Sequence, residues 1–351
     1  MKQRIEYFDT TKGILMFFLI WGHMIIFAKT LGIESDFTQT IQNTVPFYRA
    51  FFMQTFFFIT GFCTSWNKPF KPFLIGNFKT IILPAFIFLP LAFLTNVIIG
   101  KECSLDAIVA LVIKYLTDGI PWFLSALFFA KMIYWTMKKK YQSTIAEWIV
   151  IIALFLVGLV IKESTSLPNN WSYQHAMLML PFLALGCLSK TINTDGLKFC
   201  GFEVWGGILL SNKILSILSL PYFGIIALWQ IMGMGLGFPA VDAYLDIHYI
   251  SAPFHLAFAV SGTALILLIA KKLQKCTALN LFGRQSLFVY LAHTFVVFCL
   301  MKLWQTAELP TASYMEGVIF YLSIYIISLL LLCMGCHLME RKAFGWMVGK
   351  F

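Results

Sequence analysis

Charged residues are scarce in this chain, and acidic residues are scarcer than basic ones. Of the 351 residues only 12% are charged, with 16 acidic and 26 basic side chains, whereas 60% are hydrophobic. A water-soluble globule of this length needs more polar surface than that composition supplies. The scarcity excludes a soluble enzyme and predicts an all-α polytopic membrane protein.

Grouped metal ligands and phosphate-binding loops are also missing from the sequence. The eight cysteines are scattered, and Cys333-Met-Gly-Cys336 lies inside an apolar stretch, where small packing residues are the simpler interpretation. No stretch is convincing as a strand, so we expect no Gly-rich loop between a strand and a helix. We therefore expect no bound metal and no resident cofactor.

Long apolar runs dominate what is present. Ten runs are long enough to cross a bilayer core of about 30 Å as helices. The connections between them are too short for a soluble domain, so residues 1–351 are expected to form a single integral membrane domain. The predicted spans are 13–33, 47–66, 79–99, 121–137, 147–162, 174–189, 200–219, 250–270, 285–304 and 317–338.

Basic residues gather before the first predicted span and in every second connection after it. The alternate connections have fewer lysines and arginines, or carry acids that balance them. This positive-inside pattern places both termini in the cytoplasm and explains the formal charge of +10 better than nucleic-acid binding does. The apolar segment 220–239 would break the pattern if it crossed the membrane. We therefore interpret 220–249 as an outer connection with a re-entrant or interfacial piece.

The first predicted span carries two polar residues on one face. Lys12 and His23 are eleven residues apart. That spacing is about three helical turns and roughly 16 Å along the axis, which places Lys12 at the membrane edge and His23 near mid-bilayer. An ionisable side chain at that depth costs free energy unless it lines a polar cavity. We therefore predict that His23 is functional and that chemistry takes place within the membrane.

Four stretches, in order along the chain, resemble one known family. Arg4-Ile-Glu-Tyr-Phe-Asp9-Thr-Thr-Lys12-Gly13, with Gly22-His23 after it, is similar to the opening of the acyltransferase family 3 membrane proteins, which have an Arg or Lys, ten residues, then His. Three later stretches also resemble that family: Phe52-Met-Gln54-Thr-Phe-Phe-Phe-Ile-Thr60-Gly61-Phe62, Pro121-Trp122-Phe-Leu124 and Gly283-Arg-Gln-Ser286-Leu-Phe-Val-Tyr290-Leu-Ala-His293. Gln54-Thr55 stand where relatives of the fucose 4-O-acetylase type often have Pro-Leu, which leaves the acceptor open.

The resemblance implies transfer of an acyl group, usually acetyl from cytoplasmic acetyl-CoA, to a hydroxyl of a cell-surface or lipid-linked glycan. The expected location is a bacterial plasma membrane. Lys12, with Arg4, is expected to hold the CoA phosphates at the cytoplasmic mouth, and Lys131 either joins them or snorkels to the interface. His23 is expected to act as a general base or to form an acyl-histidine, and the residues leave both open.

Other polar side chains at membrane depth are candidates for lining such a site. Asp9 lies about 21 Å along the axis from His23 on a continuous helix, so capping the helix or pairing with a basic residue is expected instead. His255 lies where an acceptor sugar could arrive, although water would satisfy it equally well. His293 follows Arg284 by nine residues, roughly 13 Å along a helix, which is a depth comparable to that of His23. The candidates, each with a structural alternative, are His293, Ser286, Tyr290, Gln54 and Trp122.

A transporter or exporter is the competing interpretation, because ten helices with buried histidines also suit a proton-coupled permease. Such folds often contain two similar halves with paired Gly- or Pro-broken helices. The sequence has no internal repeat, and the candidate residues concentrate in the first span. A catalytically inactive partner in a glycan-assembly complex stays open, as do the oligomeric state and the acyl group.

Overall fold

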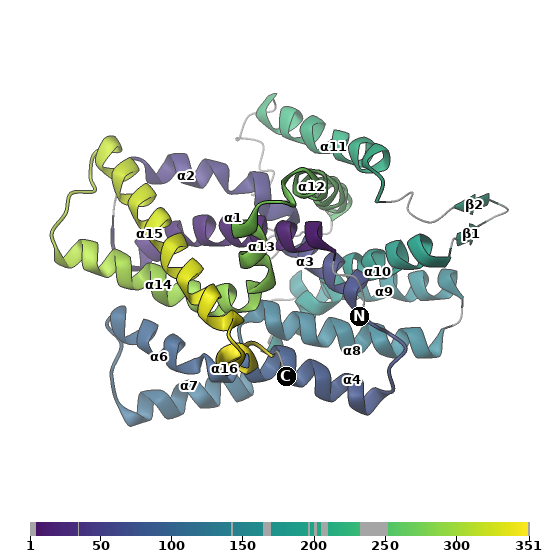
Figure 1. The fold of residues 1–351 in the computed structure, drawn as a ribbon, viewed down its shortest axis with the longest axis horizontal. Coiled ribbons are helices and arrows are strands. Elements are labelled where there is room, and N and C mark those ends of the chain that lie inside the picture. Colours follow the sequence, from purple (N-terminus) through teal and green to yellow (C-terminus); the bar gives the residue numbers. More distant parts are fainter. Residues whose placement is uncertain are drawn as a thin grey trace. The chain divides into compact units, whose positions relative to one another are not determined.

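A computed structural model gives the structure of this chain and describes residues 5–33, 35–141, 143–163, 170–195, 197–199, 202–204, 210–231 and 252–349. Nearly all described residues are helical (Figure 1). The contacts divide the chain into two units. The first unit comprises residues 1–45, 79–116 and 270–351, and the second comprises 46–78 and 117–269.

The first unit is built around the helix that carries Lys12 and His23. Its elements are α1 (Glu6–Thr30), α2 (Thr38–Thr44), most of the π-helical turn η1 (Phe78–Ile82), α5 (Leu83–Ile87), α6 (Leu89–Ile98), α7 (Leu105–Thr117), α13 (Thr277–Arg284), α14 (Ser286–Thr306), α15 (Tyr314–Glu340), α16 (Lys342–Gly345) and η3 (Trp346–Val348).

The second unit consists of longer helices and one small hairpin. Its elements are α3 (Pro46–Cys63), α4 (Phe70–Asn77), α8 (Trp122–Lys140), α9 (Thr144–Glu163), the 3-10 turn η2 (Asn170–Ser172), α10 (Tyr173–Asp195), β1 (Leu197–Phe199), β2 (Phe202–Val204), α11 (Asn212–Ile231) and nearly all of α12 (Ala252–Leu273).

Eight segments of the described chain are long and apolar enough to cross a membrane: Glu6–Thr30, Phe70–Ile98, Leu105–Lys140, Thr144–Lys162, Asn170–Ile192, Ala252–Leu273, Ser286–Thr306 and Tyr314–Glu340. This confirms the prediction of an all-α polytopic membrane protein. The helix α3 matches the predicted span 47–66 but is not among the eight. The number of spans, the cytoplasmic position of the termini and the single domain stay predictions.

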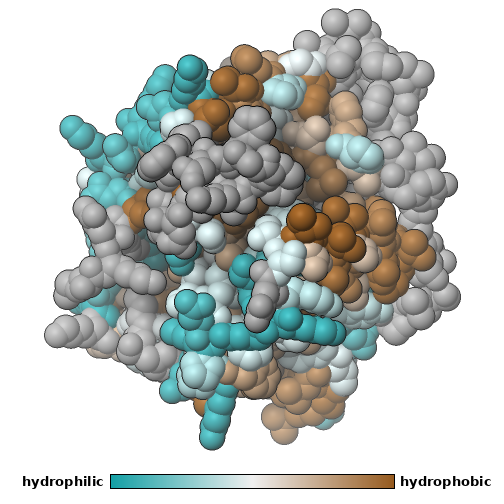
Figure 2. All heavy atoms as spheres, turned by 90° about the vertical axis from the view of Figure 1, so that its right-hand side faces the viewer, coloured by the Kyte–Doolittle hydropathy of each residue, from teal (hydrophilic) through white to brown (hydrophobic). Residues whose placement is uncertain are grey.

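Large apolar side chains cover the outer surface of several of these helices. Four apolar side chains of α9 are more than half exposed, with Val160 at 71%: Ile149, Ile152, Leu156 and Val160. Figure 2 shows hydrophobic patches beside hydrophilic ones on one face of the molecule. Exposed apolar surface on long helices is what contact with lipid chains requires.

The structure corrects the predicted span 200–219. Strands β1 and β2 pair antiparallel, with Leu197 opposite Val204, and the next helix, α11, begins only at Asn212. The apolar run was placed too early because aromatic and β-branched residues are as frequent in strands as in buried helices. Residues 220–231, assigned to an outer connection, continue α11 through Pro221. The rest of the segment 220–249 lies outside the described residues.

The connection predicted between residues 99 and 121 contains a helix that sequence reasoning missed. Helix α7 runs over Leu105–Thr117, and none of its residues is buried. Its apolar residues are half-buried or exposed, with Leu105 at 74% and Leu116 at 59% exposed. The helix is short for a span, since 13 residues rise about 20 Å. An apolar run of this length is too short to be predicted as a membrane-spanning helix, so the sequence indicated only a connection here.

In the first unit, α1 and α13 cross with their backbones in direct contact. A Cβ atom added to Gly13 would lie 2.0 Å from the carbonyl oxygen of Leu279, and one added to Gly283 would lie 1.7 Å from that of Asp9. Real Cβ atoms do not approach a backbone oxygen so closely, so only glycine fits at these two positions. Small residues at a helix crossing are the usual means of close packing in membranes.

The second unit repeats this arrangement with different helices. A Cβ atom on Gly61 of α3 would lie 1.9 Å from the carbonyl oxygen of Leu183, and one on Gly186 of α10 would lie 1.9 Å from that of Phe58. Each helix thus places its glycine against the backbone of the other. Three of the four glycines at the two crossings, Gly13, Gly61 and Gly283, belong to the motifs singled out above.

Candidate active site

His23 lies on the same unbroken helix as Lys12, as the sequence predicted, three turns further along. Its Nδ1 is 2.8 Å from the carbonyl oxygen of Leu19, one turn earlier on α1. A carbonyl oxygen only accepts hydrogen bonds, so Nδ1 carries the hydrogen and donates it. In the neutral ring the lone pair then resides on Nε2. The helix backbone therefore selects the tautomer in which Nε2 is the basic nitrogen.

His293 of α14 lies beside His23, with ring centroids 5.1 Å apart and an angle of 76° between the ring planes. It is 3% exposed, whereas His23 is half-buried. The Nδ1 atom of His293 lies 2.8 Å from the carbonyl oxygen of Tyr290 and 3.2 Å from that of Val289. Both imidazoles therefore direct Nδ1 to their own helix and share one tautomer. The sequence had placed the two rings at comparable depth.

Aromatic rings adjoin the histidine pair. The Phe27 ring lies 5.5 Å from that of His23 and 6.2 Å from that of His293, between centroids. Phe27 in turn stacks on Phe298 at 4.4 Å. Apolar rings keep the local dielectric low, which strengthens the interaction of any charge that develops on an imidazole with nearby dipoles.

Lys12 forms an ion pair with Asp9, with 2.8 Å between Nζ and Oδ1. The Asp9 side chain is 8% exposed and that of Lys12 is 24% exposed. Asp9 thus pairs with a basic residue, one of the two roles expected for it. Lys271, in the same unit, places its Nζ 5.2 Å from the centroid of the Tyr7 ring on α1. Arg4, the other predicted donor contact, lies outside the described residues.

Ser286 and Tyr290 share α14 with His293. Ser286 is the first residue of the helix and is half-buried. The Tyr290 ring centroid lies 6.2 Å from that of His293, and the Tyr290 carbonyl holds the histidine Nδ1. Tyr290 therefore contributes its backbone as well as its ring to the histidine pair.

Sequence reasoning missed Gln285, the residue between α13 and α14. Its side chain is 1% exposed. Neither its amide oxygen nor its amide nitrogen has a hydrogen-bond partner among the described residues. The signal was present, because Gln285 directly precedes Ser286 in the motif Gly283 to His293. Only its burial, which depends on the packing of α13 against α1, distinguishes it from an ordinary polar loop residue.

The other predicted site residues lie in the second unit. Lys131 is half-buried, with its Nζ 5.9 Å from the centroid of the Phe73 ring. The Trp122 ring lies 5.7 Å from that of His175. Gln54 is fully buried and its Nε2 is 3.1 Å from Nε2 of His255. Gln54 thereby joins α3 to α12, the structural role that the sequence allowed for it.

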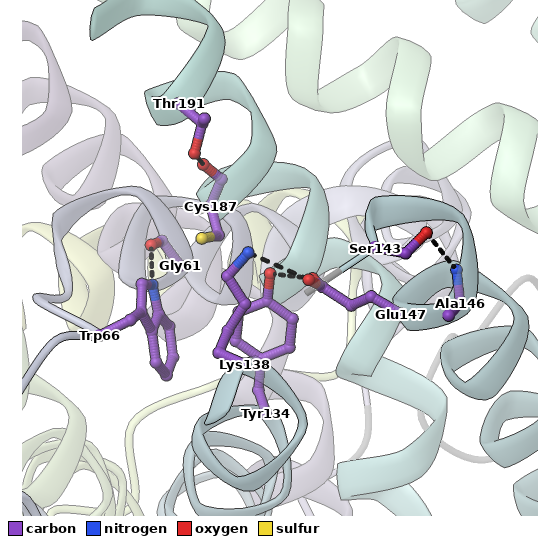
Figure 3. Close-up of polar contacts among 9 residues, drawn as sticks. All are labelled: Gly61, Trp66, Tyr134, Lys138, Ser143, Ala146, Glu147, Cys187 and Thr191. Carbon is purple, nitrogen blue, oxygen red and sulfur yellow. Dashed lines mark hydrogen bonds and ion pairs between the residues drawn. The ribbon is translucent and has the colours of Figure 1, made fainter. Parts of the chain in front are cut away.

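A buried carboxylate in the second unit was not foreseen. Glu147 of α9 is 4% exposed and accepts a hydrogen bond of 2.5 Å from the Tyr134 hydroxyl. The Lys138 ammonium lies 3.0 Å from its other oxygen. Figure 3 shows both side chains of α8 pointing toward this carboxylate, with the Cys187 sulfur of α10 nearby. The hydrogen bond from Tyr134 and the ion pair with Lys138 join α9 to α8 through this carboxylate.

A family model described as an acyltransferase domain matches residues 5–337, which is nearly the whole chain. No curated protein matches the chain, and no solved structure does.

Among the described residues, no group of three or more His, Cys, Asp or Glu side chains could hold a metal ion. The expectation that no cofactor is resident stays a prediction.

Proposed function

Since this chain belongs to acyltransferase family 3, we propose that it moves an acetyl group from cytoplasmic acetyl-CoA to a hydroxyl of a cell-surface or lipid-linked glycan. The family supports acyl transfer in general, and the eight apolar helices support an integral membrane enzyme. A bacterial plasma membrane is the location we propose. The donor, the acceptor and the roles of the residues below are our proposal.

The observation that carries the proposal is the fixed tautomer of His23, whose Nδ1 lies 2.8 Å from the Leu19 carbonyl oxygen. Nε2 takes the proton of the acceptor hydroxyl while the hydroxyl oxygen attacks the thioester carbonyl carbon. The carbon–sulfur bond then breaks, and the imidazolium returns the proton to the departing thiolate. The products are the ester and CoA with a free thiol, and His23 regains its starting form.

The position of His293 beside His23 limits the positive charge that the two rings can carry together. Two protonated rings whose centroids are 5.1 Å apart would repel each other. With an effective dielectric constant of 20, unit charges at that separation interact by about 3 kcal/mol. The pair therefore carries at most one positive charge, and a neutral His293 leaves that charge to His23 when His23 takes the proton. Nε2 of His293 lies 3.5 Å from the Thr294 hydroxyl, which limits rotation of the ring.

Lys12 is the proposed contact for the phosphates of the donor, together with Arg4, whereas the donor role expected of Lys131 stays a prediction. The axial distance from Lys12 to His23, roughly 16 Å, suits an anionic head group at the mouth and a thioester at the end of a long arm. Asp9 balances the charge of Lys12. A phosphate with two negative charges attracts the ammonium more strongly and displaces the carboxylate.

The test is acyl transfer from radiolabelled acetyl-CoA in membranes that contain the wild type or His23→Ala at matched protein levels. Loss of a general base lowers the rate by about 100-fold or more. The matched control is His337→Ala, the same substitution at an exposed position of α15, which should keep the wild-type rate. An active His23→Ala variant would refute the mechanism, and a folded wild type that transfers nothing would refute acetyl-CoA as donor.

A second experiment separates base catalysis from an acyl-histidine intermediate. The reaction is quenched rapidly in the absence of acceptor, and His23 is examined for covalently bound label.

A further inference from the structure

The first unit holds a buried amide that no described residue engages in a hydrogen bond. Gln285 is 1% exposed, and both polar atoms of its side chain lack a hydrogen-bond partner among the described residues. Native structures rarely bury a polar group without a partner, because its lost contact with water is then not replaced. Such a side chain needs a ligand or water to satisfy it.

The position of Gln285 on the chain locates the missing partner. Gln285 follows α13, whose Gly283 contacts the backbone of Asp9, so it lies near the end of α1 that carries Lys12. It also precedes His293 by eight residues along α14, which is roughly 12 Å of helix. The proposed path of the donor, from Lys12 to the two histidines, therefore passes the level of Gln285.

The chemistry of the side chain indicates which part of the donor it meets. A glutamine amide offers two N–H donors and one carbonyl acceptor. The pantetheine arm of CoA contains two secondary amides between the diphosphate and the sulfur, and each has one N–H and one carbonyl. A primary amide and a secondary amide can form two hydrogen bonds with each other, with donor and acceptor roles exchanged.

We propose that Gln285 binds an amide of the pantetheine arm and thereby selects CoA-type thioesters over shorter ones. This inference rests on the proposed function, because it assigns a part of the same donor. Gln285 is a binding residue and takes no proton. The bound arm supplies the hydrogen bonds that burial removed from the amide.

Substitution of Gln285 has an unusual expected signature. Gln285→Met keeps the length of the side chain and removes the unpaired polar atoms, so the empty protein should be as stable as the wild type or more stable. The same change should raise the KM for acetyl-CoA about tenfold, since two hydrogen bonds to the donor are lost. Gln305→Met, the same substitution at the exposed end of α14, is the matched control and should change neither property.

The experiment uses the full chain in lipid nanodiscs and follows release of the free thiol from two donors. One is acetyl-CoA, and the other is S-ethyl thioacetate, which has neither amides nor phosphates. We expect the kcat/KM for acetyl-CoA to fall about tenfold in Gln285→Met and that for S-ethyl thioacetate to stay unchanged. An equal loss with both donors, an unchanged KM, or a lower unfolding midpoint in Gln285→Met would show a structural or water-bound glutamine and overturn the proposal. A wild type that releases no thiol from acetyl-CoA would instead contradict the proposed function.

Discussion

Each unit of this protein buries a glutamine near a histidine-bearing helix, and the two glutamines differ in their hydrogen-bond partners. In the second unit, Gln54 of α3 reaches His255 of α12 at 3.1 Å, so the amide connects two helices. In the first unit, Gln285 reaches no side chain or backbone group among the described residues. The first arrangement is typical of a contact that holds helices together. The second leaves the hydrogen-bonding capacity of the amide unused among the described residues, as the binding role proposed for Gln285 requires.

The histidines differ in the same way. His23 and His293 each direct Nδ1 to a carbonyl of their own helix. His255 instead bonds to the side chain of Gln54, and its Nδ1 has no partner among the described residues. An imidazole held by its own backbone keeps one orientation whatever binds beside it. That property suits a base, whereas an imidazole held by another helix suits a structural contact.

The largest effect should come from the feature that the two units share, the close glycine crossing. Gly283→Ala and Gly186→Ala each place a Cβ atom within 2 Å of a backbone oxygen, so the helices must separate. We expect each variant to lose about 3 kcal/mol of stability or fail to fold. The measurement is the thermal unfolding midpoint in detergent. Gly224→Ala on α11, where a Cβ would meet nothing within 4 Å, is the control. If either crossing tolerated alanine as Gly224 does, the two units would not share this packing.

A smaller effect separates the two glutamines. Gln54→Met removes the partner of a buried imidazole, so we expect a loss of about 1–2 kcal/mol of stability with no change in the KM for acetyl-CoA. This is the reverse of the signature expected for Gln285→Met. Unfolding midpoints and donor KM values measured on the same preparations test both variants. Equal behaviour of the two would remove the distinction between a structural amide and a ligand-binding one.

The smallest effects concern the ion pair at the start of α1. Lys12→Gln should raise the KM for acetyl-CoA about fivefold, and the increase should shrink at high salt because exposed charges are screened. Asp9→Asn should lower that KM slightly, because Lys12 then loses a competitor for the phosphates. Lys29→Gln, at the other end of the same helix, is the control and should have no effect. An Asp9→Asn variant with a raised KM would show that the ion pair positions Lys12 instead of competing with its ligand.

Local periodicity was enough to place Lys12 and His23 on one helix, because their relation depends only on the rise per residue. The depth of His293 followed in the same way from its distance to the basic end of its span. The pairing of Gln54 with His255, 201 residues apart, could not be foreseen, since it depends on how α3 packs against α12. The burial of Gln285 and the Glu147 cluster were missed for the same reason. Strands β1 and β2 and helix α7 were missed because each is shorter than an apolar run that crosses a membrane.

The crossing of α1 and α13 has a consequence for motion. Helix α1 meets one stretch of the chain twice, where Asp9 contacts Gly283 and where the ring of His23 lies 5.1 Å from that of His293. Only Gln285 separates α13 from α14 in that stretch. Two contacts along one helix prevent α14 from sliding or turning relative to α1. Whatever opens this protein to admit a substrate must therefore carry both histidines together, so that the register of the two rings is the same before and after each turnover.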